Sequence, residues 1–184
     1  MATLIHLNGP PGIGKSTLAA LWADRHPGTL NLDIDTLHRL VGGWQDEDNR
    51  THDVLRPVAL AMAATHLAGG RDVVLPQFLG RPDAIAAFER TATLNGARFV
   101  ELVLLAGRAE SIARFENRSD RSEWDVHNRA LVARHGGAAF LGEMYDTVPG
   151  VLAARPDAVV VPSRSGAVED TYAAIAAALT PRTP

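Results

Sequence analysis

The chain has a single lysine, Lys15, and the other 17 of its 18 Lys and Arg residues are arginine. This lysine lies in the run Gly9-Pro10-Pro11-Gly12-Ile13-Gly14-Lys15-Ser16, which matches the phosphate-binding pattern G-x-x-x-x-G-K-[ST] in full. An ammonium on a flexible stem fits between two phosphates inside a tight loop of backbone amides, whereas the planar guanidinium of arginine does not. We therefore interpret Lys15 as a functional residue that contacts phosphate groups.

The neighbours of Lys15 are those that a phosphate-binding loop needs. Glycines in this loop allow backbone conformations that are closed to other residues, so the main chain can approach an anion closely. The amide N–H groups converge on the phosphates at a helix N-terminus, where the helix dipole also favours negative charge. Ser16 would place its hydroxyl on Mg²⁺. The predicted phosphate-contacting set is Gly9, Pro10, Pro11, Gly12, Ile13, Gly14, Lys15, Ser16 and Thr17.

Two carboxylates follow the strand predicted over residues 29–32. Alternation of side chains puts Asp33 and Asp35 on the same side of the chain, at the strand end where open α/β sheets bind ligands. One carboxylate there can hold Mg²⁺ through water while the other orients and deprotonates an acceptor hydroxyl. The alternative for Asp35 is that it caps a short helix over residues 36–40.

Strand-like apolar runs alternate with segments of helical periodicity, and this alternation predicts an α/β fold with a parallel sheet and helices on both faces. The predicted strands cover residues 3–8, 29–32, 72–76, 98–105 and 158–161. The predicted helices cover residues 15–26, 53–69, 82–95, 109–119 and 167–179, with one more within 124–145. A length of 184 residues suits one domain, which we expect to span residues 1–184.

Two polar segments interrupt this alternation. Residues 42–52 surround a lone tryptophan and form either a mobile loop on the acceptor side or a solvated acidic loop without a role. Residues 114–135 carry several arginines and little apolar periodicity. In a phosphate-binding protein, an arginine-rich insertion between the fourth and fifth strands is where a closing lid would lie, although a solvated pair of helices would have the same composition.

Composition narrows the class of ligand and the location. The net charge of −3 and the pI near 6.1 give no polybasic field for nucleic acid or a membrane surface, so we expect a small polyanionic ligand. The absence of cysteine excludes disulfides and thiolate metal sites. The chain runs from Met1 into the first predicted strand without a leader pattern or a long apolar span, and we expect a cytoplasmic monomer or homodimer.

The histidines give no clear indication of a metal-binding or catalytic site. His6 lies in a predicted strand and reads as a packed core residue rather than a ligand. Five further histidines show no spacing typical of metal ligands: His38, His52, His66, His127 and His135.

These motifs together resemble the small-molecule kinases of the nucleoside monophosphate kinase superfamily, with shikimate kinase, gluconate kinase and chloramphenicol phosphotransferase as the nearest comparisons. The shared features are the glycine loop with Lys15-Ser16, the Asp33-x-Asp35 pair, the arginine-rich segment and a short loop and helix after the fifth strand. The resemblance spans nearly the whole chain in layout, and the glycine loop is its diagnostic part. It implies a three-layer P-loop NTPase fold with five parallel strands in the order 2-3-1-4-5 and a lid over residues 114–135 that closes over ATP.

The resemblance also implies roles for four arginines. Arg114 would lie along the adenine, and either Arg118 or Arg121 would neutralise the transferring phosphoryl group. Arg164, in the turn after the fifth strand, would contact the nucleotide on its adenine side. The structural alternative is that these are surface arginines, as the i, i+4 spacing of Glu110 and Arg114 suggests, and that the turn is an ordinary strand-to-helix connection.

For the carboxylates, the resemblance implies that Asp35 is the base at the acceptor hydroxyl and that Asp33 is a water-mediated partner of Mg²⁺. The chain departs from its relatives after the third strand, where residues 73–81 carry no Walker B aspartate, and this places more weight on Asp33. Gln77 and Arg81 follow that strand and are candidate substrate contacts suited to a polar or anionic acceptor. The alternative is that they belong to the N-terminal loop of the next helix.

The sequence as a whole favours an ATP- and Mg²⁺-dependent phosphotransferase acting on a hydroxyl of a small molecule. A nucleoside or nucleotide kinase is the second enzyme hypothesis, which Arg81 would support by binding an acceptor phosphate. A regulatory module that hydrolyses ATP slowly is the hypothesis from another class. Asp35 separates the two classes, because a regulator needs no base at an acceptor hydroxyl.

Overall fold

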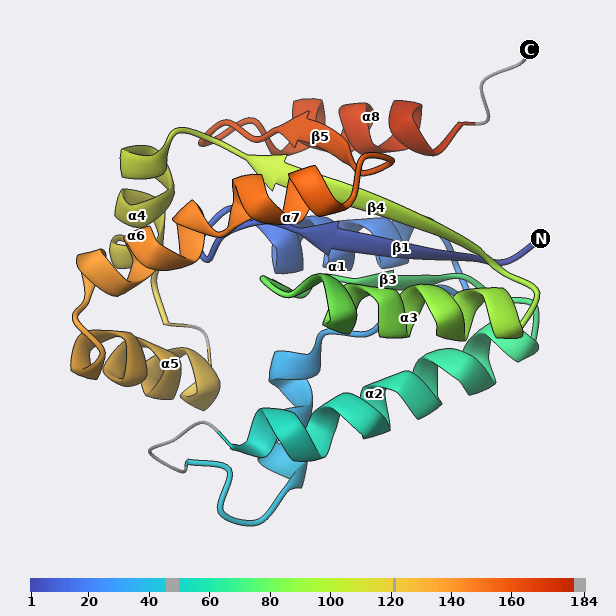
Figure 1. The fold of residues 1–184 in the computed structure, drawn as a ribbon, viewed down its shortest axis with the longest axis horizontal. Helices are drawn as coiled ribbons and strands as arrows, with labels where there is room; N and C mark the ends of the chain where they lie inside the picture. Colours follow the sequence, from blue (N-terminus) through green and yellow to red (C-terminus); the bar gives the residue numbers. More distant parts are fainter. Residues whose placement is uncertain (46–49, 121, 181–184) are drawn as a thin grey trace.

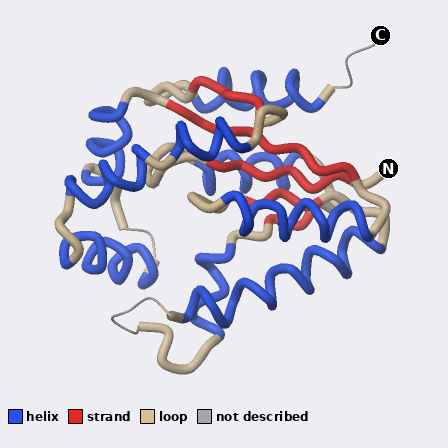
Figure 2. The backbone as a smooth tube through the Cα atoms, in the orientation of Figure 1, coloured by secondary structure: helices blue, strands red, loops and turns tan. Residues whose placement is uncertain are grey.

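The computed structural model describes residues 1–45, 50–120 and 122–180. Its sheet consists of β1 (Thr3–Asn8), β2 (Leu30–Asn31), β3 (Val73–Leu75), β4 (Arg98–Leu105) and β5 (Val159–Pro162). The strands pair in parallel in the order β2-β3-β1-β4-β5 (Figures 1 and 2). This confirms both the predicted α/β class and the strand order that the resemblance implied.

Helices connect the strands. They are α1 (Lys15–Arg25), the 3₁₀ helix η1 (Ile34–Leu40), α2 (Thr51–Ala68), α3 (Pro82–Leu94), α4 (Arg108–Glu116), α5 (Glu123–Arg134), α6 (Ala138–Asp146), α7 (Val148–Ala154) and α8 (Val168–Leu179). The helix predicted within 124–145 is in fact two helices, because Gly136 and Gly137 adopt positive φ values of 112° and 60° and break the chain between them. Helix α7 was not predicted, since it has only seven residues and a proline in its first turn.

The central strand β1 is buried on both faces and separates two hydrophobic cores. Leu4 belongs to the core beneath α2 and α3, together with Ile85 and Phe88. Ile5 points to the other face and packs with α1 and α8. All six residues of β1 are buried, as expected for a parallel strand covered on both faces, although Thr3, His6 and Asn8 are polar.

The segment predicted to be a lid, residues 114–135, comprises the end of α4, the connection to α5, and α5 itself, beside the end of the sheet where the strands finish (Figure 1). The segment has little apolar periodicity, as expected, but it still buries several apolar side chains. Trp124, Leu131 and Val132 are 5%, 4% and 7% exposed, and the spacings of seven and eight residues put them on one face of α5. This apolar face anchors the segment and was obscured by its many charged residues.

Among the described residues, no helix has the length and apolar character needed to cross a bilayer.

Candidate active site

The loop between β1 and α1 has the backbone that its glycines predicted. Gly9, Gly12 and Gly14 have φ values of 129°, 81° and 100°. A Cβ atom on Gly12 would lie 2.6 Å from the backbone nitrogen of Phe115 in α4, so the loop packs directly against that helix. The Lys15 ammonium donates hydrogen bonds to the carbonyls of Gly9, at 2.8 Å, and Pro10, at 3.0 Å. The loop therefore folds around its own lysine.

Two side chains hold this loop from outside, through one carbonyl oxygen. The Ile13 carbonyl accepts hydrogen bonds from Arg114 and from the Ser163 hydroxyl, both at 3.0 Å. Arg114 also donates to the Ser163 carbonyl at 3.2 Å. Arg114 thus ties the phosphate loop to the segment after β5, where Arg164 also lines the cavity.

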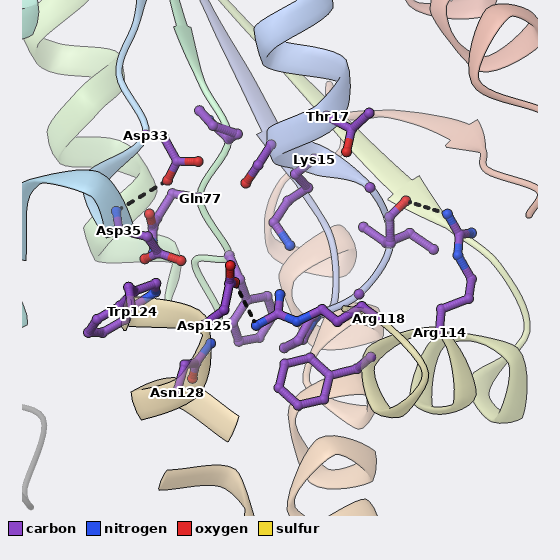
Figure 3. A pocket seen from close by; sticks show the side chains of 18 of the residues that line it. Lys15, Thr17, Asp33, Asp35, Gln77, Arg114, Arg118, Trp124, Asp125 and Asn128 are labelled. Atoms are coloured by element: carbon purple, nitrogen blue, oxygen red, sulfur yellow. Dashed lines mark hydrogen bonds and ion pairs between the residues drawn. The ribbon is translucent and has the colours of Figure 1, made fainter. Parts of the chain in front are cut away.

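The two aspartates have different positions. Asp33 is the N-cap of η1, and its carboxylate accepts a hydrogen bond from the backbone N–H of Asp35 at 3.2 Å. The capping role considered for Asp35 therefore belongs to Asp33, which leaves the Asp35 side chain to face the cavity beside Gln77 and Trp124 (Figure 3). Asp33 also lies near the Ser16 hydroxyl, which lowers the pKa of Asp33 against the larger effect of burial.

Burial shifts the pKa values of Asp33, Asp35 and Lys15. Burial, and then the neighbouring Asp35, raises the pKa of Asp33 to about 6, and burial raises the pKa of Asp35 as well. Burial lowers the pKa of Lys15 to about 8, although Asp35 and Asp33 oppose this shift and Arg118 adds to it. The cluster thus combines one buried carboxylate, one partly buried carboxylate and a partly desolvated lysine, and a bound cation would favour the charged form of the two carboxylates.

These groups line one cavity of about 930 Å³, which extends from the phosphate loop to α5 in the predicted lid segment. On the side opposite the phosphate loop its wall contains Gln77, Phe78, Trp124 and Asn128. The Gln77 carbonyl lies 2.9 Å from Nε2 of His6, so this segment is held from beneath by a buried residue of β1. The prediction that His6 is a packed residue rather than a ligand agrees with its full burial.

Arg118 reaches into this cavity from the connection between α4 and α5 (Figure 3). Its guanidinium lies over the Phe115 ring, 4.4 Å from the centroid, and Nη2 is 3.2 Å from an oxygen of Asp125. That ion pair lacks hydrogen-bond geometry, and both Nε and Nη2 are buried without a hydrogen-bond partner among the described residues. Such donors are suited to an anion. The other lid candidate, Arg121, lies outside the described residues.

Arg81 does not join the site. Its side chain is 77% exposed and makes a two-pronged contact with Asp83, with nitrogen–oxygen distances of 3.1 and 2.6 Å. Because Pro82 begins α3, Arg81 is the N-cap of that helix, and its side chain pairs with the first turn instead of turning back to the cavity. The structure thus gives Arg81 the place that the helix-loop alternative predicted, outside the cavity, and lends no support to a contact between Arg81 and the acceptor.

Sequence reasoning missed the contribution of α5. Trp124, Asp125 and Asn128 all line the cavity, and the i, i+4 spacing of Trp124 and Asn128 was the available signal. Trp124 stacks on His38, with ring centroids 3.8 Å apart, and Trp44 lies edge-on to His127 at 5.4 Å. Trp44, in the described part of the 42–52 segment, therefore lies against α5. Its residues 46–49 lie outside the described residues.

The fold and this site define a P-loop nucleotide-binding domain of kinase-like architecture. The family model described as an AAA domain, AAA_33, matches residues 4–136, and the chain belongs to this family. No curated protein matches the sequence.

Several solved structures are similar in fold. The tunicamycin resistance protein of Deinococcus radiodurans superposes with a TM-score of 0.64 at 15% identity, over 96% of this chain and 95% of that protein. A gluconokinase from Sinorhizobium meliloti 1021 gives 0.61 at 16% identity, over 97% and 91%. The protein APE1195 gives 0.62 at 19% identity, over 96% of each chain. At these identities the likeness shows a common fold.

Proposed function

We propose that this protein is an ATP- and Mg²⁺-dependent phosphotransferase that moves the γ-phosphoryl group to a hydroxyl of a small molecule. One observation carries the proposal. Lys15, Asp35 and Arg118 come from three separate segments and line one cavity, close enough for each to act electrostatically on the others. Phosphoryl transfer needs this combination of a phosphate-binding lysine, a base at the acceptor and a cation on the transferring group.

The reaction would proceed by displacement at the γ-phosphorus. The acceptor oxygen forms the new bond to phosphorus while the bond to the β–γ bridging oxygen breaks and that oxygen leaves on ADP. Asp35 takes the acceptor's proton, and its burial favours that role by raising its pKa. Lys15 and Arg118 stabilise the negative charge on the phosphoryl oxygens. Arg114 and Ser163 act indirectly by keeping the phosphate loop in place through the Ile13 carbonyl.

The residues near Asp33 fit a magnesium ion. A serine hydroxyl and a carboxylate provide the oxygen donors that Mg²⁺ prefers. Burial, and then the neighbouring Asp35, raises the pKa of Asp33 to about 6, and a bound cation would favour its charged form. Ser16 and Asp33 would hold the ion, Asp33 through water. The ion would supply charge neutralisation on the β- and γ-phosphates.

The acceptor is best matched by a neutral or amine-bearing hydroxylated molecule. Arg39 lies on the acceptor side of the cavity, but it is paired with Glu123 at 3.3 Å, and Arg118 faces Asp125. Asp35 and Asp125 add negative charge to the same region. Since Arg81 lies elsewhere, the expectation of an anionic acceptor and the nucleotide-kinase hypothesis both lose the residue that supported them. The gluconokinase among the structural neighbours supports a small-molecule kinase by its name and fold, without indicating the acceptor.

A panel of acceptors tests this proposal. Neutral polyols and sugars, amine-bearing antibiotics, nucleosides and nucleoside monophosphates are each added to the protein with MgATP, and ADP release is compared with the rate without acceptor. We expect stimulation by at least one neutral or amine-bearing alcohol and none by nucleoside monophosphates. Stimulation by a monophosphate would favour the nucleotide kinase, and an unstimulated slow rate throughout would favour the regulatory ATPase.

A further inference from the structure

Asp35 has two histidine neighbours in the folded protein, and the spacing of these histidines in the sequence did not indicate a metal site. His38 follows in η1, and His52 lies in the first turn of α2. Each of the three residues offers one ligand atom, and these atoms all lie within 4.8 Å of one another. Two nitrogens and one carboxylate oxygen form the donor set that binds transition metals in proteins.

The two imidazoles are already at a distance that suits a shared ion. Nε2 of His38 and Nδ1 of His52 are 3.2 Å apart and share a hydrogen bond, which an ion between them would replace. With metal–nitrogen bonds of about 2.05 Å, as for zinc, this separation corresponds to an N–metal–N angle of about 100°, close to tetrahedral. The Asp35 carboxylate offers the third ligand atom, within 4.8 Å of both nitrogens, and a rotation of its side chain would complete a three-residue ligand set.

Neighbouring side chains fix the orientation of the His38 ring, the more deeply buried of the two imidazoles. His38 is fully buried, and its ring is stacked on Trp124 at 3.8 Å with an interplanar angle of 17°, so the imidazole cannot rotate freely. Asp35 and His52 line the cavity. An ion held by the three residues would therefore be supported from behind by His38 and would keep an open position toward the acceptor side of the cavity.

We propose that Asp35, His38 and His52 form a binding site for a divalent transition metal of the zinc type on the acceptor side of the cavity. This site is distinct from the magnesium position at Ser16 and Asp33. The two aspartates face different partners, since Asp33 lies near Ser16 whereas Asp35 lies near Trp124 and Gln77. Nitrogen donors also separate the two ions, because Mg²⁺ prefers oxygen ligands and keeps several waters.

Such an ion would add to the chemistry of the acceptor side. Its open position would take a water or a hydroxyl oxygen of a bound acceptor, and a metal-bound hydroxyl loses its proton more readily. The second oxygen of Asp35 would stay available to the acceptor. The site does not depend on the proposed kinase activity, since the ion can be bound and measured without nucleotide.

Cobalt titration of the metal-free, full-length protein without nucleotide tests the site. We expect one Co²⁺ per chain, with the visible absorption of a four- or five-coordinate ion, displaced by Zn²⁺ but not by a large excess of Mg²⁺. His52→Gln should weaken this binding by about 10²-fold, and His38→Gln should do the same where it folds. His66→Gln is the matched control, because His66 lies on the same helix as His52, is exposed and contacts the Gly28 carbonyl instead. It should bind Co²⁺ like the wild type.

Two results would overturn the site. One is wild-type protein that binds no Co²⁺ above the level of His52→Gln. The other is equal loss of binding in His66→Gln, which would mean that surface histidines bind the probe. Loss of kinase activity with metal binding intact would count against the proposed function alone, so the two proposals fail in different ways.

Discussion

The two ends of the cavity differ in whether backbone or side-chain atoms form their walls. The phosphate end is mostly backbone, in which a continuous loop folds around Lys15 and is held by Arg114 and Ser163 through the Ile13 carbonyl. The opposite end, where we propose that the acceptor binds and which we call the acceptor end, is made of side chains from η1, the segment after β3, and α5, which meet only in the folded protein. A backbone site recognises a common group such as phosphate, whereas a side-chain site can be changed one residue at a time to suit a particular acceptor.

The largest effect should come from the phosphate end. Lys15→Ala removes the cation that the loop is folded around, and we expect ATP turnover to fall by about 10³-fold. Lys15→Arg should restore little, because the guanidinium does not fit the loop. The measurement is steady-state ADP release with MgATP. Turnover within a few fold of wild type in Lys15→Ala would contradict the assignment of this loop to phosphate.

At the acceptor end, Asp35→Asn should lower phosphoryl transfer by about 10²-fold while leaving ATP affinity nearly unchanged, since the residue serves the acceptor. Asp33→Asn provides the contrast, because it should raise the Mg²⁺ concentration needed for activity. The two quantities are kcat with a saturating acceptor and the dissociation constant of a nonhydrolysable ATP analogue. Loss of nucleotide binding in Asp35→Asn would exchange the two roles.

Arg118 sits between the two ends. Arg118→Ala should lower kcat by up to about 10²-fold with little change in the KM for ATP, because its contact strengthens as charge moves onto the transferring group. Arg81→Ala is the matched control, since Arg81 is exposed and paired with Asp83, and it should stay near wild-type activity. Equal effects of the two substitutions would mean that the lid arginine acts through general charge rather than position.

The smallest effect concerns His6, which contacts the Gln77 carbonyl beneath the acceptor end, and the pH dependence of stability that it causes. Burial lowers the pKa of His6 to about 4, against opposing contributions from Glu101 and the Gln77 carbonyl, so the folded protein holds it neutral. In the unfolded chain His6 has its ordinary pKa of about 6.5 and binds a proton below that pH, whereas in the folded protein it does not until about pH 4. The folded state therefore loses stability as the pH falls from about 6.5 toward 4. Between pH 7 and pH 5.5 this loss should be about 1 kcal/mol.

Urea unfolding at the two pH values measures this loss. His6→Gln should remove it, and His66→Gln, which changes an exposed histidine, should retain it. An identical pH dependence in wild type and His6→Gln would contradict the burial argument.

Local patterns predicted the phosphate end and most of the fold. The glycine loop is contiguous, and β1 and β4 were predicted with their observed bounds because apolar runs define strands directly. The acceptor end was only partly predictable. Asp35 was found because it lies two residues from Asp33, whereas Trp124 and Asn128 reach the cavity only because α5 folds back over η1.

Side-chain direction accounts for the remaining errors. Arg81 follows β3 as Gln77 does, but its side chain turns to Asp83, and nothing in the sequence spacing distinguishes the two. His38 and His52 are 14 residues apart and meet only through the path of the chain between η1 and α2.

The central claim is that the γ-phosphoryl group leaves ATP for an acceptor bound beside Asp35. Its most direct test is to follow γ-labelled phosphate from MgATP with the best acceptor of the panel, using wild type and Asp35→Asn side by side. Our account predicts label in an organic phosphate ester with the wild type and about 10²-fold less with Asp35→Asn, while both bind nucleotide equally. Label recovered only as inorganic phosphate, at the same rate with and without acceptor, would contradict the account and identify a nucleotide-hydrolysing regulatory domain.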